Sequence, residues 1–319
     1  MPLGEFDLIA RYFTRPVRRA ALGVGDDCAL FAPAPGMQLA TSSDMLVEGR
    51  HFLSTVAPQR LGHKALAVNL SDLAACAAQP LAFTLALALP QADEAWLEGF
   101  SRGLLALADE HGCELVGGDT TRGPLTICIT VFGEVPTGKA LLRSGARAGD
   151  DLYVSGTLGA ARLALEAFRG TVVLPGDAFE TVRVAMEQPQ PRVALGLALR
   201  GVATSAIDIS DGLLGDIGHL LRRSNAGALL DVDALPRSAV LATQTRALQR
   251  ECLLAGGDDY ELLFTAPPGR AAAVHAASAQ GKIAVTRIGR IEAEPGLRLV
   301  DGRGEPVANT YSSFDHFRS

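Results

Sequence analysis

The hydrophobic and polar positions of the N-terminal half follow both helical and extended spacing. Apolar residues three and four positions apart predict helices at residues 4–14, 58–77 and 93–111. Continuous or alternating apolar runs predict strands at residues 37–46, 81–89, 114–120 and 125–135. Pro80 and Pro90 bound the second of these strands, and Gly112 follows the third helix as a stop signal. This mixture is typical of an α/β or α+β domain.

The C-terminal half continues the mixture after a polar, glycine-containing connection, GKALLRSGARAGD. Strands are predicted within DLYVSGTLG, SAIDISDG, ALLDVD, YELLFTA and AVTRIGRIEA. Helices are predicted near residues 159–168, 192–200 and 212–225, the last of them clearly amphipathic. A length of 319 residues also favours two cores over one. We therefore expect two domains, residues 1–137 and 138–319.

Composition narrows the class of protein. Apolar residues make up 48% and charged residues 20%, which indicates a well-packed chain, and the net charge of -6 argues against a nucleic-acid surface. No apolar run is long enough to span a membrane, and the acidic start MPLGEFDLIARYF is unlike a signal peptide. The five cysteines form no CxxC pair, so we read them as reduced core residues rather than a disulfide or zinc framework. These features predict a cytoplasmic protein without a membrane partner.

Two glycine-rich stretches partly match known nucleotide-binding motifs. GEVPTGKA, residues 133–140, has the P-loop spacing, but Ala140 stands where a Ser or Thr hydroxyl would ligate Mg²⁺. Gly145 and Gly149 would also interrupt the helix that such a loop requires. GVGDDCA, residues 23–29, has two of the three dinucleotide glycines, beside acidic residues that would repel a pyrophosphate. Both stretches are therefore interpreted as ordinary loops.

Six aspartates lie at the ends of apolar segments, beside glycine or small polar residues: Asp27, Asp44, Asp72, Asp119, Asp208 and Asp211. Each one alone could cap a helix or bind a turn amide. Together they favour a shared cation, and oxygen ligands without clustered His or Cys indicate Mg²⁺. Arg143 is the best candidate cation for a phosphate, although a solvent-exposed loop arginine is equally compatible with its position. This set points to phosphoryl transfer.

Several motifs together resemble the thiamine-monophosphate kinase family of the aminoimidazole ribonucleotide synthetase-like ATP-binding superfamily. They occur in family order over nearly the whole chain: GEFDLIARYF, GVGDDCA, TSSDMLVEGRHF, ALAVNLSDLAA, GGDTTRGP, RSGARAGD, AIDISDGLLGDIGHL, GGDDYELLF and YSSFDHF. The resemblance implies a two-domain α/β fold of the α+β type, with a mixed N-terminal sheet used for dimerisation and a C-terminal α/β domain. It also implies a cytoplasmic homodimer that transfers the γ-phosphate of ATP to thiamine monophosphate without a phosphoenzyme, using several Mg²⁺ ions.

The same resemblance assigns roles to individual residues. The metal-binding positions are Asp27, Ser42, Ser43, Asp44, Asp72, Asp119, Asp208 and Asp211. The nucleotide-binding positions are Gly118, Asp119, Arg143 and Ser210. The substrate positions are His51, Asp258 and Tyr311. No nucleophile or general base is expected, because the acceptor is itself an anionic phosphate. Asp258 and Tyr311 stand where Glu and Trp are common in the family, so the departures from the family pattern concern the thiamine pocket and not the phosphoryl transfer.

Two other functions remain possible on the sequence. A related ATP-using enzyme would carry the same aspartates but use a different acceptor. Selenophosphate synthetase is a weak candidate, because the first cysteine, Cys28, lies inside GDDCALF rather than in a glycine-rich N-terminal segment. A non-catalytic nucleotide- or metal-binding protein would bind ATP without producing ADP. The number of aspartates argues against binding alone.

Overall fold

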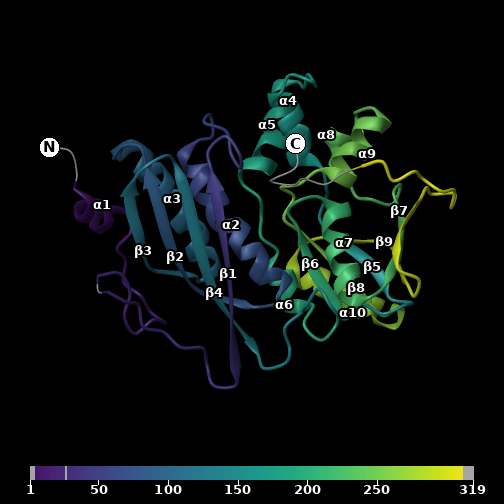
Figure 1. The fold of residues 1–319 in the computed structure, drawn as a ribbon, viewed down its shortest axis with the longest axis horizontal. Coiled ribbons are helices and arrows are strands. Elements are labelled where there is room, and N and C mark those ends of the chain that lie inside the picture. Colours follow the sequence, from purple (N-terminus) through teal and green to yellow (C-terminus); the bar gives the residue numbers. More distant parts are fainter. Residues whose placement is uncertain (1–3, 26, 312–319) are drawn as a thin grey trace. The chain divides into compact units, whose positions relative to one another are not determined.

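The structure is a computed structural model that describes residues 4–25 and 27–311 (Figure 1). The chain divides into two compact units. The first comprises residues 1–73 and 78–138, and the second comprises residues 74–77 and 139–319. Within the described residues, no helix combines the length and the apolar character that crossing a membrane requires.

The first unit is built on a four-stranded mixed sheet (Figure 1). The strand order is β1 (Met37–Val47), β4 (Thr126–Pro136), β2 (Gln79–Leu89) and β3 (Glu114–Arg122). The β1–β4 and β4–β2 pairs are antiparallel, and the β2–β3 pair is parallel. The helices are α1 (Glu5–Tyr12), α2 (Pro58–Ala75) and α3 (Glu94–His111). The predicted helices and strands of this half are confirmed to within a few residues.

Helices α2 and α3 pack closely against each other. A Cβ atom on Gly62 of α2 would lie 2.0 Å from the carbonyl oxygen of Phe100, and one on Gly103 of α3 would lie 1.8 Å from that of Gln59. Only glycine permits this approach. The start of α3 is capped by Asp93, whose carboxylate accepts from two main-chain amides, and its end by Gly112 in the left-handed conformation. The stop signal read from the sequence is therefore confirmed.

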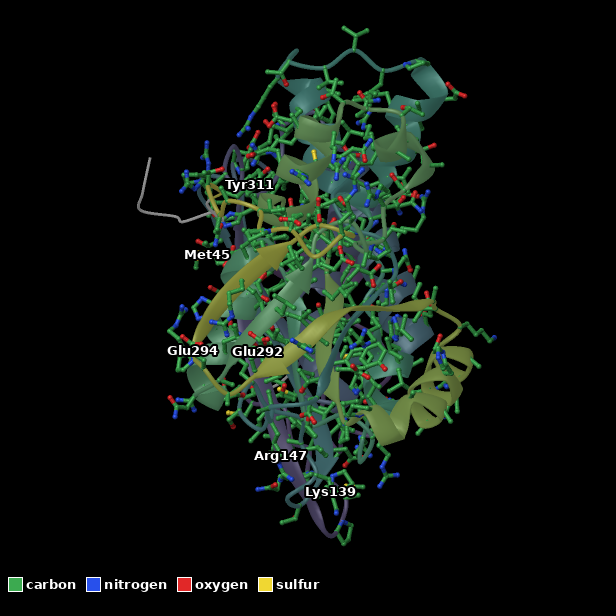
Figure 2. The ribbon with its side chains drawn as sticks, turned by 90° about the vertical axis from the view of Figure 1, so that its right-hand side faces the viewer. Met45, Lys139, Arg147, Glu292, Glu294 and Tyr311 are labelled. Carbon is green, nitrogen blue, oxygen red and sulfur yellow. The ribbon has the colours of Figure 1, made fainter. Side chains whose placement is uncertain are left out.

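The two faces of this sheet differ in burial. Along β4, Ile127, Ile129 and Val131 are almost fully buried, and Gly133 on the same face lies against Leu73 of α2. The alternate positions of β4 are only half-buried. On the edge strand β1, Leu39 is 46% exposed and Met45, labelled in Figure 2, is 55% exposed. Because side chains alternate across a strand, this unit has one core-forming face. The other face is open along β1 and is covered further across the sheet, where Phe31 packs against Phe132 of β4.

The second unit is built on a six-stranded sheet (Figure 1). The strand order is β10 (Gly296–Val300), β7 (Gly227–Asp231), β9 (Val285–Glu292), β5 (Asp151–Ser155), β8 (Glu261–Ala266) and β6 (Ser205–Ile209). Only the β10–β7 pair is parallel. Every residue of β5, β6 and β8 is buried, so these strands form the centre of the core. The sheet therefore presents the end of β6 and the start of β8 side by side.

The helices of the second unit alternate with these strands. They are α4 (Ala160–Phe168), α5 (Gly176–Glu187), α6 (Val193–Ala198), α7 (Leu213–Ser224), α8 (Ala239–Ala242), α9 (Arg246–Ala255), a short 3₁₀ turn (Pro268–Arg270) and α10 (Ala271–Gly281). The sequence predicted α4, α6 and α7 but not α5, α8, α9, α10 or strand β10. Helix α10 shows why. It buries only Val274 and Ala277, so its alanine-rich sequence contains no apolar stripe to recognise. Residues 137–150 contain no helix, which confirms the rejection of the P-loop.

Candidate active site

In the first unit, strand β1 and helix α2 bring three of the predicted residues together. The Ser42 hydroxyl donates to Oδ2 of Asp72 at 2.5 Å, and the main-chain N–H of Asp44 donates to Oδ1 of Asn69 at 3.2 Å. Asn69 is 1% exposed and its amide group donates in turn to the carbonyl of Ala65. Asn69 and Asp72 share a helix face because they are three residues apart, as the sequence predicted. The result is a group of oxygen atoms fixed between β1 and α2.

Ser43 does not join this group through its side chain. Its hydroxyl lies 3.0 Å from the Thr130 hydroxyl and donates to the Ile129 carbonyl at 3.2 Å. Alternation along β1 directs the side chain of Ser43 to the face opposite that of Ser42 and Asp44. The structure therefore separates two neighbouring residues that the sequence grouped together.

The remaining predicted residues of the first unit lie on β3 and in two loops. Gly118 has a φ of +150°, and a Cβ atom on it would lie 1.9 Å from the carbonyl oxygen of Leu85, so the β2–β3 contact requires glycine there. Asp119 and Asp27 are exposed. The Nδ1 atom of His51 accepts from the main-chain N–H of Val47 at 3.0 Å, so the proton of the neutral ring is on Nε2.

In the second unit, the turn after β6 carries three predicted residues. Asp208 is 5% exposed within the strand, and Ser210 and Asp211 follow it. The turn is held by Asp216 of α7, whose Oδ2 accepts from the N–H groups of Ser210, Asp211 and Gly212 at 3.1, 3.2 and 3.1 Å. Burial, assisted by the charge of Asp211, raises the pKa of Asp216 to about 7, although the three donors favour the ionised form. No pattern in the sequence singles out Asp216.

A second loop, Gly256–Tyr260, is attached to the same turn. The N–H of Asp258 donates to the carbonyl of Ser210, and the N–H of Tyr260 donates to that of Ile209, both at 2.8 Å. Asp258 and Tyr260 have φ values of +66° and +50°, which non-glycine residues rarely adopt. The Tyr260 hydroxyl donates to Oδ1 of Asp258 at 3.1 Å. The predicted substrate residue Asp258 therefore lies beside the predicted nucleotide residue Ser210.

Two more acids, the half-buried Asp259 and the buried Glu261, lie next along this loop and strand. Both carboxylate oxygens of Asp259 accept from the N–H of Gly159, at 2.9 and 3.0 Å, and burial raises the pKa of Asp259 well above its ordinary value. Glu261 pairs with Arg192, whose Nε lies 2.7 Å from Oε2, and accepts from the Ser155 hydroxyl. Both acids belong to the GGDDYELLF motif, so the motif itself was the signal that could have identified them. They hold the start of β8 against β5 and α4.

Arg143 and Tyr311 complete the predicted residues of the second unit. The Arg143 carbonyl accepts from the Ser224 hydroxyl at 3.0 Å, and its side chain is exposed. Burial and the charges of Arg222 and Arg143 lower the pKa of His219, while the charge of Asp211 opposes them. Tyr311, labelled in Figure 2, is half-buried against the core of this unit. Most of the terminal YSSFDHF motif lies outside the described residues.

The chemistry of the donor set fits magnesium. Carboxylate and hydroxyl oxygens are hard ligands, and the predicted metal positions contain no His or Cys. Among residues 4–25 and 27–311, no three His, Cys, Asp or Glu side chains converge closely enough to hold a metal by themselves. Magnesium commonly takes only one or two carboxylates and completes its shell with water and substrate phosphates. The donors therefore suit a metal that arrives with a nucleotide.

Fold and site together define a class. The family model "AIR synthase related protein, N-terminal domain" matches residues 25–135, and "AIR synthase related protein, C-terminal domain" matches residues 147–302. The chain is thus a two-domain protein of the AIR synthase related class. It is 47% identical over 325 residues to thiamine-monophosphate kinase from Salmonella typhimurium (strain LT2), and the match covers 99% of each chain. The chain belongs to the thiamine-monophosphate kinase family, which confirms the resemblance read from its motifs.

Solved structures agree with this assignment. The crystal structure of thiamine-monophosphate kinase from Stenotrophomonas maltophilia K279a is 44% identical, with a TM-score of 0.85 over 94% of this chain and 95% of that chain. The structure of AaThiL complexed with AMPPCP and TMP is 30% identical, with a TM-score of 0.78 over 90% and 89%. The predicted two-domain fold is confirmed.

Proposed function

We propose that this chain transfers the γ-phosphate of ATP to thiamine monophosphate, giving thiamine diphosphate and ADP. The observation that carries the proposal is the end-to-end match, at 47% identity, to a thiamine-monophosphate kinase. A relative with the same fold, AaThiL, is complexed with AMPPCP and TMP, which are an ATP analogue and the acceptor expected here. Each unit carries acidic residues that match the metal-binding positions expected for this reaction.

The proposed roles follow from the chemistry of two phosphates that repel each other. Asp72 and Ser42, already in contact, together with Asp44, Asp27 and Asp119 would hold magnesium in the first unit. Asp208 and Asp211 would do so in the second. Bound magnesium supplies neutralisation of the phosphate oxygens. Arg143, Gly118 and Ser210 would orient the nucleotide, because a positioned donor is the main requirement of phosphoryl transfer.

His51 in the first unit, and Asp258 and Tyr311 in the second, are the residues proposed to contact thiamine monophosphate. An acidic side chain suits a cationic thiazolium ring, and an aromatic ring can stack on it. Asp258 is one methylene shorter than the glutamate common in the family, but the Tyr260 hydroxyl holds its carboxylate in one direction. No side chain needs to act as nucleophile, because the acceptor is a phosphate.

The open face of the N-terminal sheet supports a homodimer. Leu39, Thr41, Ser43 and Met45 line it on β1 and are exposed, and none carries a charge. A row of uncharged side chains with exposed apolar residues, on the edge strand of a sheet, is suited to burial against a second copy. Met45→Lys should therefore shift the protein toward monomer in analytical ultracentrifugation, whereas Val173→Lys, at a 94% exposed loop position, should not. Equal sedimentation of wild type and Met45→Lys would count against dimerisation through this face.

A cytoplasmic location is proposed from the five free cysteines, two of them buried, and from the use of ATP.

The deciding experiment measures ADP release from ATP and Mg²⁺ with thiamine monophosphate, with thiamine, and without an acceptor. Release that requires the monophosphate and equals the thiamine diphosphate formed is the expected result. ATP binding without release in any of the three reactions would refute the kinase proposal. Release with aminoimidazole ribonucleotide precursors instead would assign the chain to the other activity of the superfamily.

A further inference from the structure

One carboxylate oxygen in the second unit receives three consecutive main-chain amides. Oδ2 of Asp216 accepts from Ser210, Asp211 and Gly212 at 3.1–3.2 Å, and Asp216 is only 4% exposed. Asp216 lies in the first turns of α7, which begins at Leu213, so its side chain reaches backwards past the start of its own helix. The amides before the first turn of a helix have no partner within it, and here a single acceptor satisfies three of them.

Burying the carboxylate of Asp216 in this turn costs more free energy than forming an ordinary solvent-exposed turn. Water would satisfy the same amides in an exposed turn, whereas a carboxylate loses hydration when it is buried. The three charge-assisted hydrogen bonds offset that cost only when the turn adopts the one conformation that points all three N–H groups at Oδ2. Asp216 therefore selects a single backbone conformation for residues 210–212.

The turn at residues 210–212 also positions a second loop, Gly256–Tyr260. The carbonyls of Ile209 and Ser210 accept from Tyr260 and Asp258, and a Cβ atom on Gly257 would lie 2.4 Å from the Ser210 carbonyl oxygen. The positive φ values of Asp258 and Tyr260 are held by these same hydrogen bonds. A change in the direction of the Ser210 carbonyl would therefore release the Gly256–Tyr260 loop as well.

We infer that Asp216 is a positioning residue for the kinase reaction, acting through the Ser210–Gly212 turn on both the nucleotide side and the thiamine side of the site. The inference deepens the proposed function and rests on it, because Ser210, Asp211 and Asp258 are the residues proposed to meet the substrates. Asp216 itself touches neither substrate. Its effect is to set the main chain from which those contacts extend.

The test compares Asp216→Ala and Asp216→Asn with Ile217→Val. Ile217 is the next residue of α7 and is fully buried in the core, so its truncation lowers stability without touching the turn. Asp216→Ala should raise the KM for both ATP and thiamine monophosphate by about 10- to 100-fold, the range seen when supporting residues of a metal site are removed. Asp216→Asn keeps an acceptor oxygen of the same shape and should recover much of this loss. Ile217→Val should leave both KM values unchanged.

A second measurement reports on the conformation of the turn independently of enzyme activity. In hydrogen exchange on the ligand-free protein, Asp216→Ala should accelerate exchange of the amides of residues 210–212 and of Asp258 and Tyr260, while β5 stays protected. Unchanged exchange at these amides, or unchanged KM values in a folded Asp216→Ala protein, would overturn the positioning role. If wild type releases no ADP with thiamine monophosphate, the proposed function fails, and the exchange result still decides whether Asp216 fixes the two loops.

Discussion

Replacing Asp72 by asparagine isolates the charge of one proposed metal ligand. The side chain lies on α2 and accepts the Ser42 hydroxyl at 2.5 Å. Asparagine has the same shape and retains one oxygen, so the contact with Ser42 can persist while the negative charge is lost. The substitution should therefore lower the affinity of the proposed site for magnesium and leave the packing of α2 against β1 in place.

The structure sets the expected magnitudes. A hydrogen bond to a charged group contributes about 1.5–3 kcal/mol and a neutral one about 0.5–1.5 kcal/mol, so Asp72→Asn should cost about 1 kcal/mol of folding stability. Metal neutralisation of transferred phosphates contributes several kcal/mol to the transition state. A loss of about 4 kcal/mol corresponds to roughly 10³-fold in rate. The effect on kcat should therefore greatly exceed any effect on stability.

The assay is ADP release with thiamine monophosphate over a range of Mg²⁺ concentrations, beside thermal unfolding of the same samples. Asp93→Asn serves as the matched control. Asp93 is an exposed aspartate of the same unit that caps α3, and asparagine is an equally good capping residue. It should leave both kcat and the Mg²⁺ dependence as in wild type.

Wild-type turnover by Asp72→Asn at ordinary Mg²⁺ would refute the reasoning, because it would show that this charge holds no catalytic metal. A loss of activity matched by an equal loss in Asp93→Asn would also refute it, since charge removal anywhere in the unit would then suffice. Rescue of Asp72→Asn by high Mg²⁺ would support it.

Two further predictions concern stability. Gly103→Ala places a methyl group 1.8 Å from a carbonyl oxygen of α2 and should lower the free energy of unfolding, measured in urea, by about 3 kcal/mol. Gly99→Ala is the control, because its methyl group meets a proline side chain at 3.1 Å and should lower the free energy of unfolding far less. Equal losses in the two variants would contradict the close contact of the helices. Burial opposes ionisation of Glu166, but the Thr171 hydrogen bond and the Arg162 charge together lower its pKa. A lowered pKa stabilises the fold above the unfolded value of about 4.3, and this stabilisation is lost as pH falls through the folded value. Glu166→Gln should therefore lower stability by about 1–2 kcal/mol at pH 7, and a difference in melting temperature that persisted unchanged to pH 3 would contradict this assignment.

Much of the candidate site could be predicted because its signals are local. The period of apolar residues placed α2 and β1, and the three-residue spacing of Asn69 and Asp72 placed both on one helix face. The aspartates were conspicuous because a carboxylate at the end of a buried strand is costly without a partner. Alternation along β1 could also have separated Ser43 from Ser42, had it been applied to single residues.

Other features had no local signal. Asp216 reads as an ordinary polar residue of an amphipathic helix, and only the folded turn shows three amides pointing at it. The left-handed backbone conformations of Asp258 and Tyr260 could not be predicted from the sequence, because they depend on tertiary hydrogen bonds to the end of β6 and the turn after it. Helix α10 forms although it lacks an apolar stripe, since alanine favours helix and one buried edge suffices.

The sequence by itself determined most of the helices and strands and, through its motifs, the family of this chain. These depend on side-chain chemistry and on spacing along the backbone, which neighbours in sequence share. The tertiary structure alone decided which acceptor meets which donor: Ser42 with Asp72, Asp258 with Ser210, and Asp216 with the turn before its own helix. Such pairs are fixed by strand order, register and helix packing, because hydrogen bonds act over about 3 Å in space whatever the separation along the chain.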